Sequence, residues 1–338
     1  MGTVLVTGGT GFVGGWCIVE LLKRGYTVRT TVRSLAREPA VRAAVAAITD
    51  PGDRLTFFVA DLNSDEGWDA AVSGCDYVLH VASPLGADAP SDPNVLIAPA
   101  RDGALRVLRA ATAAGVGRVV MTSSTAAASS PPQGPDTIND ETMWTDPNAP
   151  KLTAYRQSKA LAERAAWDFI IKDAGSTTLT TILPSAVLGP VLTMENLGSV
   201  QVIGRLLDGR VPGNPRLGFS IVDVRDVADI HIRAMTSPQA AGQRFIAAGD
   251  FMWMADISKT LRANLGEQAR RVPTRALPDF MLRLASLFDR SLTAVTPGLG
   301  QKRRFTSEKA RRLLDWTPRP AATTVIDCAN SLIAGKAA

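Results

Sequence analysis

Tyr155 and Lys159 have the residue types and the spacing for proton transfer. Both lie in a segment, about 152–173, whose composition predicts a helix, and a spacing of four residues puts the phenol and the ammonium on one helix face. A phenol has a reference pKa of about 10, and a nearby cation favours its ionised form, so that it exchanges protons reversibly near neutral pH. The pair indicates acid–base chemistry, although the same spacing is common on helices without function.

Two hydroxyl groups precede this helix in the chain. Ser123 and Ser124 stand at the end of the apolar segment 118–122, which predicts a strand. Neighbouring strand residues point to opposite faces of a sheet, so only one of the two hydroxyls can face a site at the strand end. A hydroxyl in that place can donate a hydrogen bond to an oxygen on which negative charge develops.

The start of the chain predicts a site for a nucleotide. An apolar strand over 3–7 leads into a glycine-rich turn, and a helix follows over about 12–24. The glycines of the turn are Gly8, Gly11 and Gly14. They allow a tight turn, a close approach to a pyrophosphate and close packing of the helix, whose first amides, at Phe12 and Val13, would face the anion. No metal ligand set accompanies the turn, so we expect no metal site.

Arg33 follows the second predicted strand, 26–32, at the position that meets the adenosine ribose in a dinucleotide fold. An acidic residue there would bind the 2′-hydroxyl of NAD, whereas arginine matches the 2′-phosphate of NADP. The sequence therefore predicts NADP(H), with a surface arginine at a strand end as the plainer alternative.

Strands and helices alternate through the first half of the chain. Strand-like segments occur at 3–7, 26–32, 55–59, 76–81, 118–122 and 177–183. Such repeats predict an α/β fold, a Rossmann-type doubly wound parallel sheet, whose ligands bind outside the carboxyl ends of the strands. A smaller C-terminal mixed lobe is expected to bind substrate. We assign 1–185 plus 219–249 to the NADP-binding domain, and 186–218 and 250–338 to the substrate-binding lobe.

Several motifs in order resemble the extended short-chain dehydrogenases/reductases, in particular the branch of dihydroflavonol reductases, cinnamoyl-CoA reductases and aldehyde/ketone carbonyl reductases. They are TGGTGFVG at 7–14, TVR at 31–33, ADL at 60–62, HVASP at 80–84, TSS at 122–124, YRQSK at 155–159 and VDVRDVADIH at 222–231. The resemblance covers nearly the whole chain. It selects Ser124 rather than Ser123 as the catalytic hydroxyl, beside Tyr155 and Lys159.

The resemblance also implies roles in cofactor binding. Asp61 and Leu62 would frame the adenine, and Pro184 would help to seat the nicotinamide. The ribose and phosphate side would be lined by Val81, Ala82 and Ser83. Tyr155 and Lys159 would also contact the cofactor, with the ammonium on the nicotinamide ribose.

The activity that this resemblance implies is an NADPH-dependent carbonyl reductase acting on a hydrophobic aldehyde or ketone, in either direction. The segment 153–159 keeps only the tyrosine and lysine of the cinnamoyl-CoA reductase signature, which argues against a CoA thioester. Apolar residues of the substrate lobe are candidates for its pocket or its core: Met194, Leu197, Phe219, Phe251, Met252, Trp253 and Met254. Two alternatives stay open, an NAD-dependent nucleotide-sugar epimerase/dehydratase and a non-catalytic NADP(H)-sensing protein.

The composition fits an ordinary globular protein: 46% of the 338 residues are hydrophobic and 20% are charged. Its net charge of +5 and its basic cluster at 302–312 are interpreted as a solvated basic face on a short helix, not a nucleic-acid site. Three separated cysteines predict reduced core thiols, and His80 and His231 predict packed residues. No apolar run is long enough for a membrane span. We expect a cytoplasmic monomer or homodimer without a signal peptide, membrane contact or nucleic-acid partner.

Overall fold

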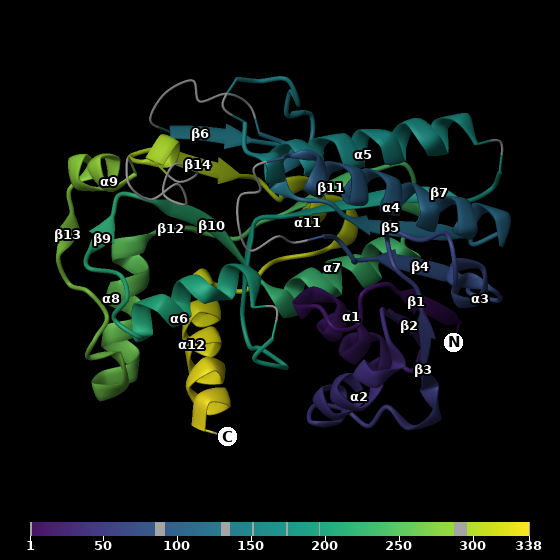
Figure 1. Ribbon diagram of the computed structural model, residues 1–338, viewed down its shortest axis with the longest axis horizontal. Coiled ribbons are helices and arrows are strands. Elements are labelled where there is room, and N and C mark those ends of the chain that lie inside the picture. Colours follow the sequence, from purple (N-terminus) through teal and green to yellow (C-terminus); the bar gives the residue numbers. More distant parts are fainter. Residues whose placement is uncertain are drawn as a thin grey trace.

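A seven-stranded parallel sheet forms the centre of the molecule (Figure 1). The computed structural model describes residues 2–84, 92–129, 136–150, 152–173, 175–195, 197–286 and 296–337. The strand order is β11-β7-β5-β4-β1-β2-β3. The strands are β1 (Thr3–Val6), β2 (Thr27–Val32), β3 (Leu55–Val59), β4 (Tyr77–His80), β5 (Arg118–Thr122), β7 (Thr178–Pro184) and β11 (Arg244–Ala247). The short runs of apolar and β-branched residues form strands because both faces of the sheet are buried.

Helices cover both faces of this sheet. One face carries α1 (Phe12–Lys23), α2 (Glu38–Ala46) and α7 (Val224–Thr236), and the other carries α3 (Trp68–Val72), α4 (Asn94–Ala113) and α5 (Ala154–Lys172). The alternation along β1 shows both faces: Val4 and Val6 belong to the core under α1 and α7, whereas Leu5 belongs to the core under α4. The predicted doubly wound α/β fold is confirmed.

The later part of the chain builds a smaller lobe with its own core. A three-stranded sheet is formed by β8 (Ala186–Leu188), β10 (Gly218–Asp223) and β12 (Phe251–Trp253). The helices around it are α6 (Gln201–Leu207), α8 (Met254–Leu265) and α12 (Ala321–Ala337). A strand pair, β9 (Asn214–Pro215) with β13 (Ala276–Leu277), and the helix α9 (Asp279–Ala285) complete its outer side. Figure 1 shows this lobe beside the central sheet.

The segment 219–228 divides between the two parts of the molecule. We expected it to return to the large domain as one piece, but β10 pairs with β8 and β12 instead of the central sheet. Only the helix that follows, α7, packs on the central sheet and on α1. Asp223 ends the strand and caps the helix by accepting a hydrogen bond from the Arg225 amide at 2.9 Å, so the chain changes layer at this residue.

The basic cluster at 302–312 differs from its prediction. Residues 302–305 form a strand, β14 (Lys302–Phe305), which pairs in parallel with β6 (Asp136–Asn139) and is half-buried throughout. The short helix, α11 (Glu308–Leu314), begins only after it. The first three basic residues are therefore not a solvated helix face, because a strand partner 165 residues away in sequence holds them.

The described residues test the expectations for the cysteine thiols and for membrane-spanning helices. Cys17, Cys75 and Cys328 are free and buried, and burial raises the pKa of each thiol above its ordinary value, to about 12 for Cys328. The expectation of reduced core thiols is confirmed. No helix in this described part is long and apolar enough to cross a membrane, and no cluster of metal-ligating side chains occurs in it.

Candidate active site

The turn after β1 has the backbone geometry that its glycines predict. Gly8 has φ +76°, which L side chains rarely adopt, and its amide donates to Thr31 Oγ1 at 3.1 Å. A Cβ on Gly14 would lie 2.4 Å from the Gly8 carbonyl oxygen, so the helix can approach the turn only with glycine there. Gly11 at the start of α1 contributes no side-chain cap, which leaves the first amides free of any cap from the described residues.

Thr7 and His80 position the backbone that follows β4, next to the glycine turn. Thr7 Oγ1 accepts hydrogen bonds from the amides of Val81 and Ala82, both at 3.0 Å, and lies 2.9 Å from His80 Nδ1. Its single proton must point to the imidazole, so Nδ1 is the acceptor and the proton of the neutral ring sits on Nε2. Burial lowers the pKa of His80 to about 3, with a further lowering by the charge of Lys159. The packing role predicted for His80 is confirmed.

The adenosine side of the turn is open. Arg33 is exposed just beyond β2, and its guanidinium has no ion pair within the described chain. Asp61, after β3, accepts hydrogen bonds from the amide and side chain of Asn63 at 2.8 and 3.0 Å, and Leu62 packs against Gly103 of α4. The residues predicted to hold the adenosine end therefore lie at the carboxyl ends of β2 and β3.

A pocket beside the glycine turn adds residues that the sequence did not suggest. It is lined by the turn, by α2 and by Leu192, Thr193, Glu195 and Leu197, with an ion pair between Arg37 and Glu195 among its lining residues. Trp16 of α1 donates through Nε1 to the Pro190 carbonyl at 2.8 Å, which connects the chain just before Leu192 to the first helix. Arg37 ends the short helical turn Leu35–Arg37, four residues after Arg33 in the sequence.

Ser124, Tyr155 and Lys159 come together at the carboxyl ends of β4 and β5. The Tyr155 hydroxyl lies 3.4 Å from Ser124 Oγ, and Lys159 Nζ lies 6.0 Å from the centre of the tyrosine ring. Lys159 Nζ donates to Ser83 Oγ at 2.9 Å, which ties the ammonium to the turn after β4. The first turn of α5 is positioned by Thr153, whose hydroxyl accepts from the Arg156 amide at 3.3 Å.

Ser123 points away from this group, toward the sheet interior. Its hydroxyl donates to Glu163 Oε2 at 2.6 Å, whereas Ser124 faces Tyr155. The choice of Ser124 thus follows from the alternation of strand side chains and from the partner that occupies Ser123.

Burial dominates the electrostatics of Tyr155 and Lys159. It lowers the pKa of Lys159 to about 8, opposed by the carboxylate of Glu163, and it raises the pKa of Tyr155, opposed by the hydrogen bond to Ser124. We expected the ammonium to lower the pKa of the phenol. The structure differs, because burial penalises the phenolate and the ammonium is directed at Ser83.

Glu163 is the buried charge that the sequence analysis missed. It is fully buried two turns beyond Tyr155 on α5, and it pairs with Arg244 of β11 at 2.8 Å while accepting from Ser123 and Thr181. Arg244 also donates to two carbonyls at 2.7 and 2.9 Å and stacks 3.6 Å from the Trp144 ring centre. The sequence offered one signal for Glu163, its spacing of four residues from Lys159. The residue that pairs with Glu163, Arg244, lies 81 residues away in the sequence.

The carboxyl end of β7 completes the site. Pro184 is buried at the last position of the strand, and the Ser185 amide donates to the Ala247 carbonyl at 3.0 Å. The hydroxyl oxygen of Ser185 is buried and has no hydrogen-bond partner. Pro184 is thus on the same edge of the sheet as Ser83 and Ser124.

The apolar residues expected near a substrate divide between core and surface. Met254 is buried, and Leu197 and Met252 pack against the core of the smaller lobe. Phe219 and Met194 remain 36% and 38% exposed. The Phe251 and Trp253 rings meet edge to face, 5.0 Å between centres.

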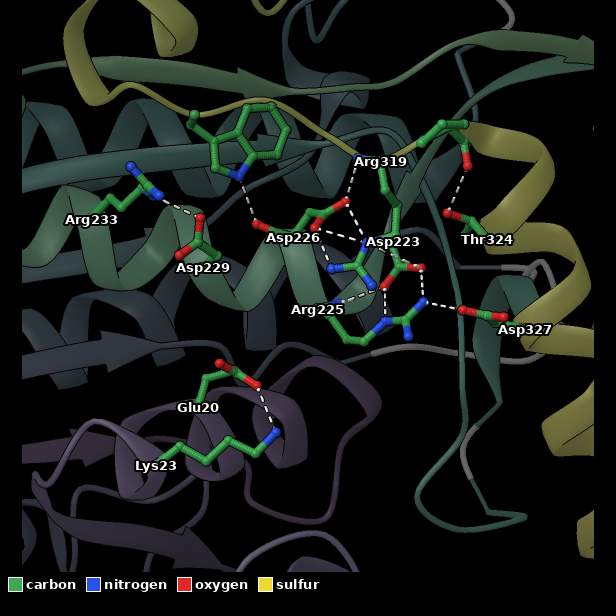
Figure 2. Close-up of polar contacts among 12 residues, drawn as sticks. Glu20, Lys23, Asp223, Arg225, Asp226, Asp229, Arg233, Arg319, Thr324 and Asp327 are labelled. Atoms are coloured by element: carbon green, nitrogen blue, oxygen red, sulfur yellow. Dashed lines mark hydrogen bonds and ion pairs between the residues drawn. The ribbon is translucent and has the colours of Figure 1, made fainter.

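An ion-pair cluster, defined as Asp223, Arg225, Asp226, Arg319 and Asp327, joins the two parts of the molecule (Figure 2). Arg225 bridges the buried Asp223 at 2.7 Å and Asp327 of α12 at 2.6 Å, and Arg319 pairs with Asp226 at 2.7 Å. Every charge in this ion-pair cluster has an opposite partner.

His231 lies on α7 under the central sheet. Its Nδ1 is 2.7 Å from the Val227 carbonyl and must donate to it, so Nε2 accepts from the Thr122 hydroxyl at 2.7 Å. Burial lowers its pKa to about 4. Like His80, it is a packed residue, as predicted.

Comparisons with known proteins agree with this architecture. The profile of the NAD dependent epimerase/dehydratase family matches residues 4–248. The chain is 33% identical to ketoreductase azaE of Aspergillus niger, over 98% of this chain and 97% of that protein, and 37% identical to cinnamoyl-CoA reductase 1 of Petunia hybrida, over 76% of each. The structure of Gre2 from Candida albicans in complex with NADPH superposes with a TM-score of 0.82 at 25% identity, over 99% of both chains. The chain therefore belongs to the NAD dependent epimerase/dehydratase family, the extended short-chain dehydrogenases/reductases.

Proposed function

We propose that the protein is an NADPH-dependent carbonyl reductase that reduces a small aldehyde or ketone of hydrophobic character to the alcohol, and that runs in reverse with NADP⁺. The observation that carries this proposal is the meeting of the Tyr155 hydroxyl with Ser124 Oγ at 3.4 Å, beside Lys159 and the carboxyl edge of the sheet. The ketoreductase and cinnamoyl-CoA reductase relatives support the same class of reaction.

The residues around the glycine turn suit a dinucleotide phosphate. The missing side chains at Gly8 and Gly14 leave the backbone accessible, and the first turn of α1 is not capped by a side chain of the described residues. The unpaired Arg33 would hold the 2′-phosphate, and Arg37, four residues later in the chain, is a second candidate. Asp61 and Leu62 would hold the adenine, and the segment 81–83 with Pro184 would hold the nicotinamide half.

When bound, NADPH supplies the hydride for the carbonyl carbon. Tyr155 gives its hydroxyl proton to the carbonyl oxygen, and Ser124 donates a hydrogen bond to the same oxygen as charge develops there. Lys159, held by Ser83, keeps a positive charge near the phenolate left on Tyr155, which stabilises the phenolate until it takes up a proton from solvent. In the reverse direction the same phenolate accepts the alcohol proton.

Tyr155→Phe tests the proposal. The change removes the hydroxyl group and with it the exchangeable proton, so we expect kcat for NADPH oxidation with an aldehyde panel to fall at least about 10³-fold, the size of a strong general-acid contribution. NADPH binding, followed by its fluorescence, should remain within a few-fold. Unchanged turnover in Tyr155→Phe would exclude Tyr155 as the proton donor.

A nucleotide-sugar epimerase or dehydratase would use the same tyrosine and lysine. Such enzymes return the hydride to the substrate and need no net NADPH, so protein purified with tightly held NAD would favour that function. A sensing protein would bind NADPH tightly and turn over no compound of the panel. The domain division and the choice between monomer and homodimer are part of the same proposal, and light scattering of the purified protein measures the latter.

A further inference from the structure

Arg303 lies on the inner side of β14. Side chains alternate along a strand, and Lys302 and Arg304 point to the other side, the first 5.8 Å from the Phe251 ring centre and the second paired with Asp136 at 2.9 Å. Phe305, on the same side as Arg303, packs against a small core cluster. Its members are Ala128, Leu183, Ile246 and Ala248.

This cluster joins the inner face of β14 to the segments that carry Ser124 and Pro184. Ala128 follows Ser124 by four residues, and Leu183 directly precedes Pro184. Figure 1 shows the carboxyl ends of β6 and β14 beside the first turn of α5, the turn that carries Tyr155. Arg303 is therefore on the substrate side, away from the glycine turn.

Arg156 brings a second guanidinium to the same place. It directly follows Tyr155 on α5 and is half-buried, as is Arg303. Burial lowers the pKa of Arg156, and the charge of Arg303 lowers it further, as a like charge nearby does. Neither guanidinium has a hydrogen bond or an ion pair within the described part of the chain.

Unpaired buried polar atoms occur in these segments. The four buried side-chain atoms without a hydrogen-bond partner in the described chain include Arg303 Nε, Gln301 Oε1 two residues before it, and Ser185 Oγ directly after Pro184. Each such atom is costly, by about 1–3 kcal/mol, and two half-buried like charges add to the cost. Folded proteins keep arrangements of this kind where a ligand completes them.

We propose that Arg156 and Arg303 bind an anionic group of the carbonyl substrate, a carboxylate or a phosphate. Guanidinium groups present planar pairs of donors that match these oxyanions. The proposal rests on the proposed function and narrows it, since the substrate is then a carbonyl compound with an acidic group away from the reacting carbon. It also gives Arg303 a role other than the solvated basic face that we expected for the residues near 302.

Matched aldehydes test this proposal. The probes are 4-formylbenzoate, 4-formylphenyl phosphate and the neutral methyl 4-formylbenzoate. For the wild-type protein we expect kcat/KM to be at least about tenfold higher for an anionic aldehyde than for the ester, the effect of one charge-assisted hydrogen bond. The first two probes distinguish carboxylate from phosphate.

Arg303→Met and Arg156→Met should each lower this preference at least about tenfold, mainly through KM, and Arg303→Lys should restore part of it. Arg304→Met is the matched control, because Arg304 is the next residue of β14 but points to the surface and pairs with Asp136. It should leave the preference unchanged. Thermal unfolding of each variant verifies that it is folded.

A binding measurement separates this inference from the proposed function. Calorimetry with the alcohol product 4-(hydroxymethyl)benzoate and its methyl ester, on NADP⁺-loaded protein, needs no turnover. Tighter binding of the acid by wild type than by Arg303→Met supports the anion site, even if no aldehyde is reduced and the proposed function fails. Equal rates for acid and ester in the wild type, or equal effects of Arg303→Met and Arg304→Met, overturn the inference and leave the reductase function standing.

Discussion

Two groups of charged side chains differ in how completely they are paired. Glu163 pairs with Arg244, and in the ion-pair cluster of Figure 2 each of the three carboxylates contacts at least one of the two guanidiniums. Arg156, Arg303 and Lys159 have no carboxylate within ion-pair distance in the described chain.

The difference separates charges that hold the fold together from charges that await a ligand. A paired, hydrogen-bonded buried charge connects elements, as Glu163 connects α5 to β5, β7 and β11. An unpaired buried charge costs stability and is retained where it contributes to function. The two groups should therefore respond in opposite ways to the same kind of substitution.

The largest effect is expected for Arg244→Met. The change leaves the carboxylate of Glu163 buried without its cation, which costs about 3–5 kcal/mol in the free energy of unfolding. Urea unfolding followed by fluorescence measures it. The double variant Glu163→Gln/Arg244→Met, without any charge, should recover part of the loss; a loss below about 1 kcal/mol in the single variant would show that the pair is not structural.

Acid should destabilise the protein through its two buried imidazoles. Their pKa values of about 3 and 4 lie below the unfolded value of 6.5, so the unfolded state takes up protons that the folded state cannot. Stability then falls as the pH drops below 6.5, by about 1.4 kcal/mol per pH unit for each histidine until its folded pKa is reached. His231→Gln should make urea unfolding less dependent on pH between 6.5 and 4; an unchanged slope would assign the acid sensitivity to other groups.

Lys159 should titrate within the working range of the enzyme. Its pKa of about 8 predicts that the ammonium is lost as the pH rises above 8, with the rate of carbonyl reduction falling about tenfold per pH unit if turnover needs that charge. The pH profile of kcat/KM with methyl 4-formylbenzoate, a neutral aldehyde, measures this decrease above pH 8. A rate that stays level to pH 10 would contradict a need for the ammonium.

The smallest effect on stability is expected for Arg303→Met. Because no partner in the described chain is lost, the free energy of unfolding should change by less than about 0.5 kcal/mol, or increase. The free energy of unfolding in urea is compared with that of Arg304→Met, which shows how much the loss of a surface ion pair costs. A loss as large as that of Arg244→Met would place Arg303 among the paired, structural charges.

Sequence patterns predicted the elements whose causes are local. The glycine turn, the alternation of strands and helices, and the spacing of Tyr155 and Lys159 depend on backbone conformations and periodicities within about twenty residues. The parallel sheet follows from that alternation, since its crossover helices must cover both faces. For this reason the fold class and the edge of the sheet that carries Ser83, Ser124 and Pro184 were predictable.

Tertiary structure alone decided which distant segments meet. The pairing of β14 with β6 and the contact of Glu163 with Arg244 join segments 80 or more residues apart, for which the sequence has no local signal. The transfer of β10 to the smaller sheet likewise depends on partners outside its own segment, β8 and β12. Whether a buried charge has an opposite charge beside it depends on these contacts between distant segments. The sequence therefore determined where chemistry would occur, whereas the packing of its later segments decided which arginines are left free to bind a substrate.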